Sequence, residues 1–408
     1  MPPDVGGPLA YFPPPRDIAE YPFDPPPELF RRQREEPVSK VRIWDGQEAW
    51  VITRYEDGKA VLSDSERFSA DPTNPGFPEK NIAYLTTLGK DRNIRGIDNP
   101  EHDRQKRMMI HDFTVKRVAE IRPKIEALVD EVLDQLLAEA PPVDLVSRLA
   151  VAVPTTVICE LLGVPYSDRE FFGHRAKALL AAPTAGAAAE AEADLVAYVE
   201  KLIDLKTESP ANDLISRMVH QQVIPGHFSR RNLVSLSRLL LVAGHDTTAG
   251  MIGLSVLLLL RHPDKLAQVR DSTDPAFITR AVDEMFRYLG STHAGRRRVA
   301  VAEVQIGGKR IRPNEGVIVL NNMMDRDGTV FDRPNELDFD RPNVRANVAF
   351  GYGIHQCPGQ LLARTELQVV HAKIWKRIPT LALAVDMDEL TFLEGGSNFE
   401  VETLPVTW

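Results

Sequence analysis

One long apolar segment limits what this chain can fold into more than any other feature. From about Ser229 to Arg261 the pattern is that of a single helix, which His262-Pro263 then stops. At 1.5 Å per residue this helix would be about 50 Å long, enough to cross a whole domain. Its longest apolar run, Met251 to Leu260, is too short to span a bilayer, and a longer window includes His245 to Thr248, which a lipid-facing helix would not carry. We therefore expect a protein without a membrane anchor.

The rest of the chain predicts a mostly helical α+β protein. Apolar residues recur at three- and four-residue spacing over much of residues 101–290, and short strand-like pieces lie on either side. The expected helices cover residues 121–138, 143–162, 176–205 with a break at Pro183, 275–288 and 359–378. The expected strands cover residues 304–306, 309–311 and 316–319, a hairpin of 41–44 and 49–52 around Asp45-Gly46, and a strand pair in the tail 391–408.

The organisation along the chain predicts one domain with an arm in front of it. Residues 1–27 are rich in proline and should form an extended arm on the surface, while residues 28–408 show neither an internal repeat nor a dividing linker. Residues 71–97 have the composition of a long loop, which inside a compact domain is often functional. The alanine-rich segment 176–205 is either plain helix or a mobile flap between two helices.

Composition excludes several classes of protein. The 408 residues carry a formal net charge of -9, whereas a general nucleic-acid binder is usually basic. The two cysteines do not make a disulfide framework, and Cys159 lies in an apolar run typical of a small buried hydrophobe. The first residues have neither the basic start nor the apolar core of a signal peptide. We expect a cytoplasmic protein that binds no nucleic acid.

The second cysteine has very different surroundings. It lies in Phe350-Gly-Tyr-Gly-Ile-His-Gln-Cys357-Pro-Gly359, directly before a predicted helix. The glycines allow the backbone to turn tightly and to approach a bulky group, and a thiolate at a helix N-terminus is stabilised, which lowers its pKa. Two chemistries fit this setting: a thiolate ligand of a metal, or a reactive nucleophile with His355 as its base.

At its fixed positions this segment resembles the haem-binding signature of the cytochrome P-450 superfamily. The resemblance implies that Cys357 is the axial ligand of the iron in haem b (iron protoporphyrin IX). Phe350, Gly351 and Gly359 would then enclose the ligand, and His355 would reach a haem propionate. A thiolate ligand pushes electron density onto iron and favours cleavage of the O–O bond.

The middle of the long helix, Ala243-Gly-His-Asp-Thr247-Thr248, resembles the distal helix of the same family. Gly244 costs roughly 1 kcal/mol of helix stability relative to alanine. The resemblance explains this cost, because Ala243 and Gly244 would form the groove for dioxygen. Asp246 and Thr247 would deliver protons, and His245 would face away without a catalytic role. The alternative is a kinked, buried helix whose polar residues are satisfied locally.

Two further basic positions resemble the propionate-binding residues of the family. His102 occupies the place of its histidine, but Lys106 stands where the family has an arginine, and lysine lacks the bidentate geometry. Arg107 is the alternative residue for that role. Arg298 ends a run of three arginines that would by itself predict a solvated face, yet its spacing to the following strand matches the second propionate arginine.

The pair Glu284-x-x-Arg287 lies on one face of a predicted helix. Such a pair is by default a solvated salt bridge. The resemblance implies instead a buried structural pair that anchors the irregular stretch 323–349, with Arg341 as a third member.

The resemblance also indicates where the substrate binds. The pocket should include parts of the 71–97 loop, residues 171–185, 241–243, 292–295 and 396–399, and be mostly apolar. Its expected lining residues are Val242, Thr292, His293, Ala294, Gly295, Asn398 and Phe399.

The sequence therefore predicts a haem-thiolate monooxygenase of the soluble bacterial, actinomycete type. It would insert one atom of O2 into a small apolar organic substrate by hydroxylation, epoxidation or O-dealkylation. No flavin or reductase domain is visible, so electrons should come from a ferredoxin and a ferredoxin reductase. An acidic ferredoxin would dock beside the positive charges of His102 to Arg107 and Arg364.

Three alternatives remain open at this point. A haem-thiolate nitric-oxide reductase lacks the acid before the threonine, so Asp246 argues against it. A peroxide-using peroxygenase usually lacks the acid–alcohol pair. A non-catalytic haem protein would have no need for Asp246 and Thr247.

Overall fold

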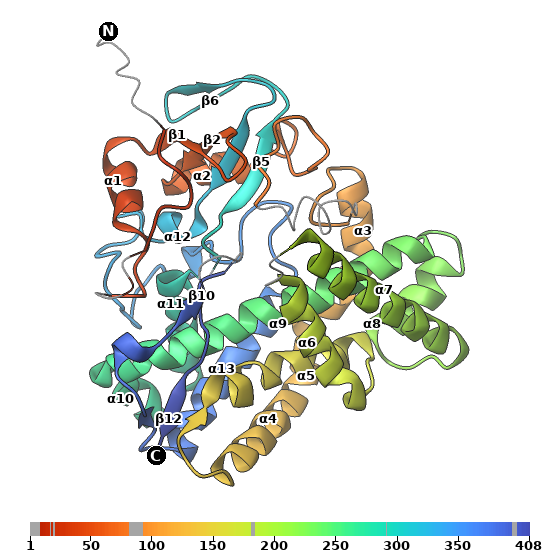
Figure 1. Cartoon of the computed structure of the whole chain (residues 1–408), viewed down its shortest axis with the longest axis vertical. Helices are drawn as coiled ribbons and strands as arrows, with labels where there is room; N and C mark the ends of the chain where they lie inside the picture. Colours follow the sequence, from red (N-terminus) through yellow and green to blue (C-terminus); the bar gives the residue numbers. More distant parts are fainter. Residues whose placement is uncertain are drawn as a thin grey trace.

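A single helix, α9 (Arg230–Arg261), crosses the middle of the molecule, as the sequence predicted (Figure 1). The Ser229 side chain caps it by accepting a hydrogen bond from the Asn232 amide. At the other end His262 leaves the helix and Pro263 begins the next one, so the predicted stop lies where it was expected.

The computed structural model describes residues 9–16, 18, 21–80, 93–180, 184–290, 292–393 and 398–408. The other α-helices in these ranges are α1 (Pro27–Glu35), α2 (Tyr55–Ser63), α3 (Glu101–Met109), α4 (Val115–Leu137), α5 (Ala152–Leu162), α6 (Arg169–Leu180), α7 (Ala185–Glu208), α8 (Leu214–Met218), α10 (Pro263–Asp271), α11 (Pro275–Leu289), α12 (Asn321–Met324) and α13 (Gln360–Arg377). The strands are β1 (Val38–Arg42), β2 (Glu48–Ile52), β3 (Phe68–Ser69), β4 (Val143–Asp144), β5 (Arg296–Ala300), β6 (Val304–Ile306), β7 (Lys309–Ile311), β8 (Gly316–Val319), β9 (Ala382–Leu383), β10 (Phe392–Leu393), β11 (Glu400–Val401) and β12 (Pro405–Thr407).

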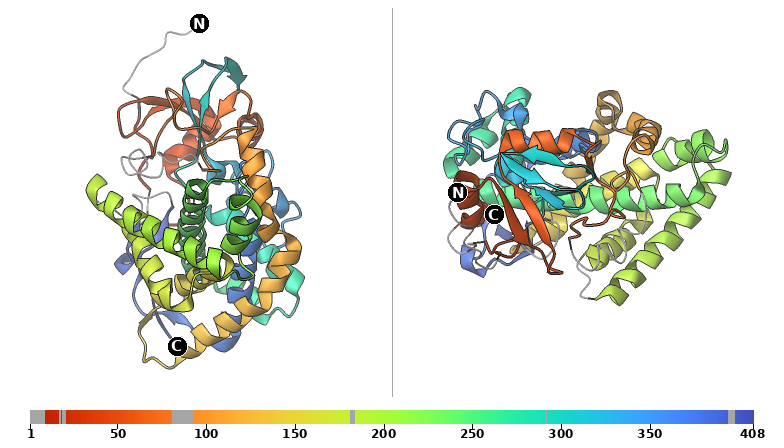
Figure 2. Two further views of the ribbon diagram at one scale, coloured as in Figure 1. Left: turned by 90° about the vertical axis from the view of Figure 1, so that its right-hand side faces the viewer. Right: turned by 90° about the horizontal axis from the view of Figure 1, so that it is seen from above.

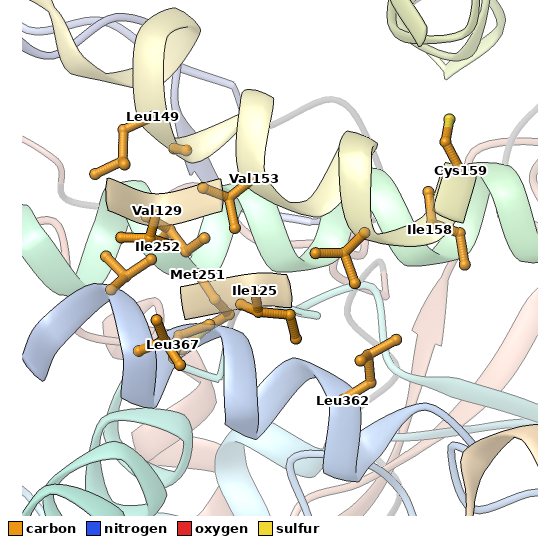
Figure 3. Packing of buried hydrophobic residues seen from close by; sticks show 14 of the residues in the cluster. Ile125, Val129, Leu149, Val153, Ile158, Cys159, Met251, Ile252, Leu362 and Leu367 are labelled. Carbon is orange, nitrogen blue, oxygen red and sulfur yellow. The ribbon is translucent and has the colours of Figure 1, made fainter. Parts of the chain in front are cut away.

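The core forms where α9 packs between α4, α5 and α13. Ile125 of α4, Val153 of α5, Met251 and Ile252 of α9, and Leu367 of α13 are all buried in one cluster (Figure 3). A helix that is apolar on all sides has to be buried. By length and composition α9 is apolar enough to cross a membrane, but most of its apolar window is buried inside the protein, which accounts for its character.

A five-stranded sheet in the order β1-β2-β8-β5-β3 lies at the opposite end of the molecule from α4 to α8 (Figures 1 and 2). The predicted hairpin is confirmed as β1 and β2, which turn through Gly46 at φ 88°. Strand β5 was not predicted, because adjacent arginines are typical of a solvated surface. Its pairing with β8 instead buries Arg297 and Arg298.

The expected helix over residues 143–162 is wrong at its beginning. Val143 and Asp144 form β4, which pairs with β12 near the C-terminus, and a π-helical segment, Val146–Ala150, precedes α5. The partner strand lies more than two hundred residues away along the chain, so local periodicity did not reveal it. The tail forms the predicted strand pair, β10 with β11, and in addition supplies β12.

The alanine-rich segment forms helix on both sides of its predicted break: α6 ends at Leu180 and α7 begins at Ala185. Pro183 itself lies outside the described residues, as do residues 81–92 of the predicted loop 71–97. The described part of the N-terminal arm is extended, but Phe12 and Phe23 are buried, so the arm does not simply lie on the surface.

Glu284 and Arg287 are completely buried and joined by two hydrogen bonds of 2.7 Å. Arg341 also binds Glu284, with an Nε–Oε2 distance of 3.1 Å. The terminal guanidinium nitrogens of Arg287 donate to backbone carbonyl oxygens: Nη1 to those of Asp325 and Pro334, and Nη2 to that of Glu336. One carboxylate thereby holds α11 and the irregular stretch before the cysteine loop together.

We predict that Glu284→Gln lowers the free energy of unfolding by about 3–5 kcal/mol, because it leaves two buried guanidinium groups without their counter-charge. Denaturant titration would measure the change. The control is Arg280→Gln on the same helix, whose partner Asp340 lies 3.7 Å away in an exposed pair. That change should cost less than about 1 kcal/mol. Equal effects of the two substitutions would contradict a structural role for the buried pair.

Candidate active site

A large cavity lies between α9 and the beginning of α13 and contains about 1450 Å³ of empty space, part of it continuous with solvent. Residues from both sequence motifs meet there although they are more than a hundred positions apart. The predicted site residues that line it are His102, Lys106, Ala243, Gly244, Thr247, Thr292, Phe350, His355, Cys357 and Gly359.

The cysteine loop turns back on itself before α13. The Cys357 amide donates to the Phe350 carbonyl over 2.9 Å, which brings the two ends of the loop together. Gly351 and Gly353 have φ angles of 82° and 75°, in the left-handed region that favours glycine. A Cβ atom on Gly353 would lie 2.2 Å from the Leu62 carbonyl oxygen, so this loop fits against α2 only without a side chain there.

The thiol of Cys357 faces the cavity in a largely apolar setting. Burial raises its pKa, and the positive charge of Arg296 and the Gly359 amide offset this only in part. The sequence predicted a lowered pKa for Cys357, and for the protein without a cofactor that prediction is wrong. Desolvation raises the pKa by more than the helix N-terminus lowers it. A bound cation would favour the thiolate at this position.

The described residues around Cys357 do not form a metal site of their own. In the part of the chain that the structure describes, there is no group of three or more His, Cys, Asp or Glu side chains that would hold a metal ion. A porphyrin brings its own nitrogen ligands to iron and can take a cysteine thiolate as an axial ligand. The nucleophile alternative is weaker, because burial lowers the pKa of His355 and so disfavours a thiolate–imidazolium pair.

Basic side chains gather at one end of the cavity. The rings of His102 and His355 are 4.2 Å apart, and the Lys106 ammonium donates to the Ile354 carbonyl over 2.6 Å. Burial lowers the pKa of Arg298 to about 10, and the charge of Arg298 in turn contributes to lowering the pKa of both histidines. The Nε2 atom of His355 is buried and has no hydrogen-bond partner among the described residues. This arrangement fits a bound dianion such as a pair of carboxylates.

Lys106, not Arg107, is the basic residue of α3 that reaches the cavity. Arg107 is exposed, so it does not replace the arginine that the family has one helical turn after the histidine. Arg298 does not itself line the cavity within the described residues, whereas Arg296, on the same face of β5, does.

The opposite wall of the cavity is the middle of α9. Thr247 lines it, and its hydroxyl donates to the Ala243 carbonyl over 2.9 Å. A Cβ atom on Gly244 would lie 2.9 Å from Ile158 of α5, so the small residue also has a packing reason. His245 points to α5, where its Nδ1 lies 2.7 Å from the Thr155 hydroxyl.

Asp246 is not among the residues that line the described cavity. Its Oδ2 accepts a hydrogen bond of 2.7 Å from the Asn398 side-chain amide. The sequence predicted the residue but not this partner, because Asn398 lies on the C-terminal segment.

Of the expected pocket residues, Thr292 lines the cavity, and the others are not among the described residues that line it. Val242, Ala294 and Phe399 are buried. Gly295 makes a turn at φ 74°, close to Ile318. His293 is also buried, and burial lowers its pKa to about 4. Residues 394–397 lie outside the described ranges.

Arg296, Met251 and Glu366 are among the cavity residues that the sequence analysis missed. Glu366 is buried on α13, burial raises its pKa far above the usual value, and its Oε2 has no partner among the described residues. An acid in a helical pattern normally predicts a solvated face, so the sequence carries no signal for this one.

Comparison with known proteins identifies the family. The family model "Cytochrome P450" matches residues 187–378. The chain is 40% identical over 387 residues to pentalenic acid synthase of Streptomyces avermitilis, covering 95% of each chain. It is 41% identical over 372 residues to vitamin D3 dihydroxylase of Streptomyces griseolus, covering 91% of each. The crystal structure of mycinamicin VIII C21 methyl hydroxylase from Micromonospora griseorubida superposes with a TM-score of 0.90 at 38% identity, covering 98% of this chain and 100% of that one.

The long helix facing a cysteine loop across one cavity defines a haem-dependent oxygenase. The chain belongs to the cytochrome P450 family, whose members use haem, dioxygen and redox partner proteins, and it is a monooxygenase. The predicted mostly helical fold with small sheets is confirmed by these structures as the P450 fold.

We predict that Gly353→Ala prevents the cysteine loop from closing, because the new methyl group meets backbone rather than a movable side chain. The purified variant should contain little haem and melt at a lower temperature. The matched control is Gly46→Ala: its φ of 88° is equally unfavourable for alanine, but nothing lies within 4 Å of the added atom. It should cost only about 1 kcal/mol. Normal haem content in Gly353→Ala would show that the loop tolerates a side chain there.

Proposed function

We propose that Cys357 binds the iron of haem b and that the protein oxidises an apolar organic molecule in this cavity, with electrons from a ferredoxin and its reductase. The observation that carries the proposal is the position of the Cys357 thiol, which faces Thr247 of α9 across a cavity with a basic end. Bound there, haem supplies dioxygen binding and reductive O–O cleavage, which a thiolate ligand favours.

In this proposal the polar side chains hold the cofactor at its edges. His102, Lys106, His355 and Arg298 would bind the propionates, whose negative charge would offset the positive charge of Lys106 and Arg298. Arg296, which the sequence analysis did not single out, lies on the same face of β5 as Arg298 and would add to this site. Phe350 shields the sulfur: its ring packs 4.7 Å from the Phe286 ring and beneath the Arg364 guanidinium.

The proton path in this proposal consists of Asp246 and Thr247. Asp246 takes a proton from solvent at its carboxylate, and the Thr247 hydroxyl passes a proton into the cavity. Thr247 is held for this by its bond to the Ala243 carbonyl.

The lining indicates the kind of substrate. Leu239, Leu240, Ile158 and Met251 make the wall near Thr247 apolar, and Thr292 adds one hydroxyl. The relatives are named for pentalenic acid, vitamin D3 and a methyl hydroxylation, so hydroxylation of an apolar carbon is the reaction that we propose. A screen of candidate ligands by the shift of the Soret band would identify the chemical class.

We further propose a cytoplasmic protein in which residues 28–408 form one domain and the ferredoxin docks near α3. In this proposal fewer basic residues contribute to the docking surface than the sequence predicted. Arg364 is paired with Asp283 at 2.6 Å, and Arg104 is paired with Glu101 at 2.7 Å, so both charges are compensated. Arg107 remains as an exposed basic residue on α3.

We predict that Cys357→Ser abolishes turnover and removes the red-shifted Soret band that thiolate ligation gives the reduced carbon-monoxide adduct. The control is Cys159→Ala, which removes the other cysteine of the chain from its buried site on α5. It should keep both the spectrum and the activity. A Cys357→Ser protein that retains the wild-type spectrum would contradict the proposed ligand.

We predict that Arg107→Glu slows reduction of the haem by a ferredoxin and that the difference shrinks as salt is added, because the effect is on encounter rather than on chemistry. Stopped-flow reduction at several ionic strengths would measure it. Arg34→Glu, an equal charge reversal at an exposed site of α1, is the control. Identical slowing by both variants would mean that only the net charge matters.

A further inference from the structure

We propose that Asn398 is a positioning residue for proton delivery: its side-chain amide holds the Asp246 carboxylate in the orientation that serves Thr247. The inference rests on the proposed role of Asp246. The hydrogen bond from Asn398 Nδ2 to Asp246 Oδ2 is 2.7 Å long, and Asn398 is only 4% exposed. A carboxylate only accepts hydrogen bonds, so the amide nitrogen must be the atom that faces it.

The surface of α9 is shaped to bring Asn398 to this place. Asp246, Gly250 and Gly253 follow each other at spacings of four and three, so they lie on one face of the helix. A Cβ atom on Gly250 would lie 2.9 Å from Glu400, and one on Gly253 would lie 3.1 Å from Val401. The two glycines therefore form a groove for β11, and Asn398, two residues before this strand, reaches Asp246.

The other end of the amide is tied to the cavity. The Thr292 hydroxyl donates to Asn398 Oδ1 over 3.4 Å, a long and therefore weak bond, and Thr292 lines the cavity. Phe399, the next residue, packs edge-on against His293 and beneath the Arg16 guanidinium, which is 3.9 Å from the ring centre. Asn398 thus connects the cavity wall to Asp246 and is itself held by its neighbours.

This arrangement has a specific consequence for catalysis. A bond to one carboxylate oxygen fixes the side-chain rotamer and leaves the other oxygen available for protons. Without the bond, the Asp246 carboxylate would sample several rotamers, and fewer of them would serve Thr247. More of the reduced dioxygen would then be released as hydrogen peroxide than in the wild type, and less would go to product and water.

The test compares Asn398→Leu with Asp246→Asn in the haem-loaded enzyme, driven by NADH, a ferredoxin and its reductase. Leucine has a similar size but no donor. With a ligand from the Soret screen as substrate, the ratio of product formed to hydrogen peroxide released should fall by about tenfold in Asn398→Leu, the size expected for losing one hydrogen bond to a charged group. The double variant should be no worse than Asp246→Asn, because both changes act through one carboxylate. Glu402→Gln, an exposed change on the same segment, should leave the ratio unchanged.

A swapped variant separates positioning from mere folding. Asp246→Asn combined with Asn398→Asp restores the hydrogen bond with donor and acceptor exchanged, so the melting temperature should be close to that of the wild type. The ratio should stay as low as in Asp246→Asn, because the acid no longer lies on α9. A wild-type ratio in Asn398→Leu, or in the swapped variant, would overturn the inference. An unchanged ratio in Asp246→Asn would overturn the proposed proton path as well.

Discussion

The burial of one thiol in front of α13 is the constraint on which the proposed site depends. Its pKa is raised by its surroundings, so the ionised form is unstable unless a metal ion compensates it. No group of three or more His, Cys, Asp or Glu side chains in the described residues would hold a metal ion. In the proposed site the loop supplies one sulfur, and a porphyrin would complete the coordination of the iron.

The rest of the architecture places groups around this sulfur. The central helix α9 spans the molecule and presents Thr247 opposite Cys357, while β5 and α3 bring basic side chains to the cavity edge. Glu284 joins α11 to the segment that leads into the cysteine loop. The helix that carries Thr247 and the anchored loop that carries Cys357 therefore hold these two residues in place before any substrate enters.

The sequence predicted those parts of the structure whose signals are local. The limits of α9 followed from the apolar pattern that begins near Ser229 and from the His262-Pro263 stop, and the cysteine loop followed from its glycines. The prediction was wrong where distant partners decide, as in β4 with β12. In the site it missed Glu366, which looks in the sequence like an ordinary surface position of a helix. It also missed the bond between Asn398 and Asp246, because these partners lie far apart along the chain.

The most direct test of the central claim is X-ray absorption at the iron edge of the purified ferric protein. The account predicts a sulfur atom in the first coordination shell of the iron, alongside the porphyrin nitrogens, and the loss of that sulfur when Cys357 is replaced by serine. A first shell made only of nitrogen and oxygen in the wild-type protein would contradict it.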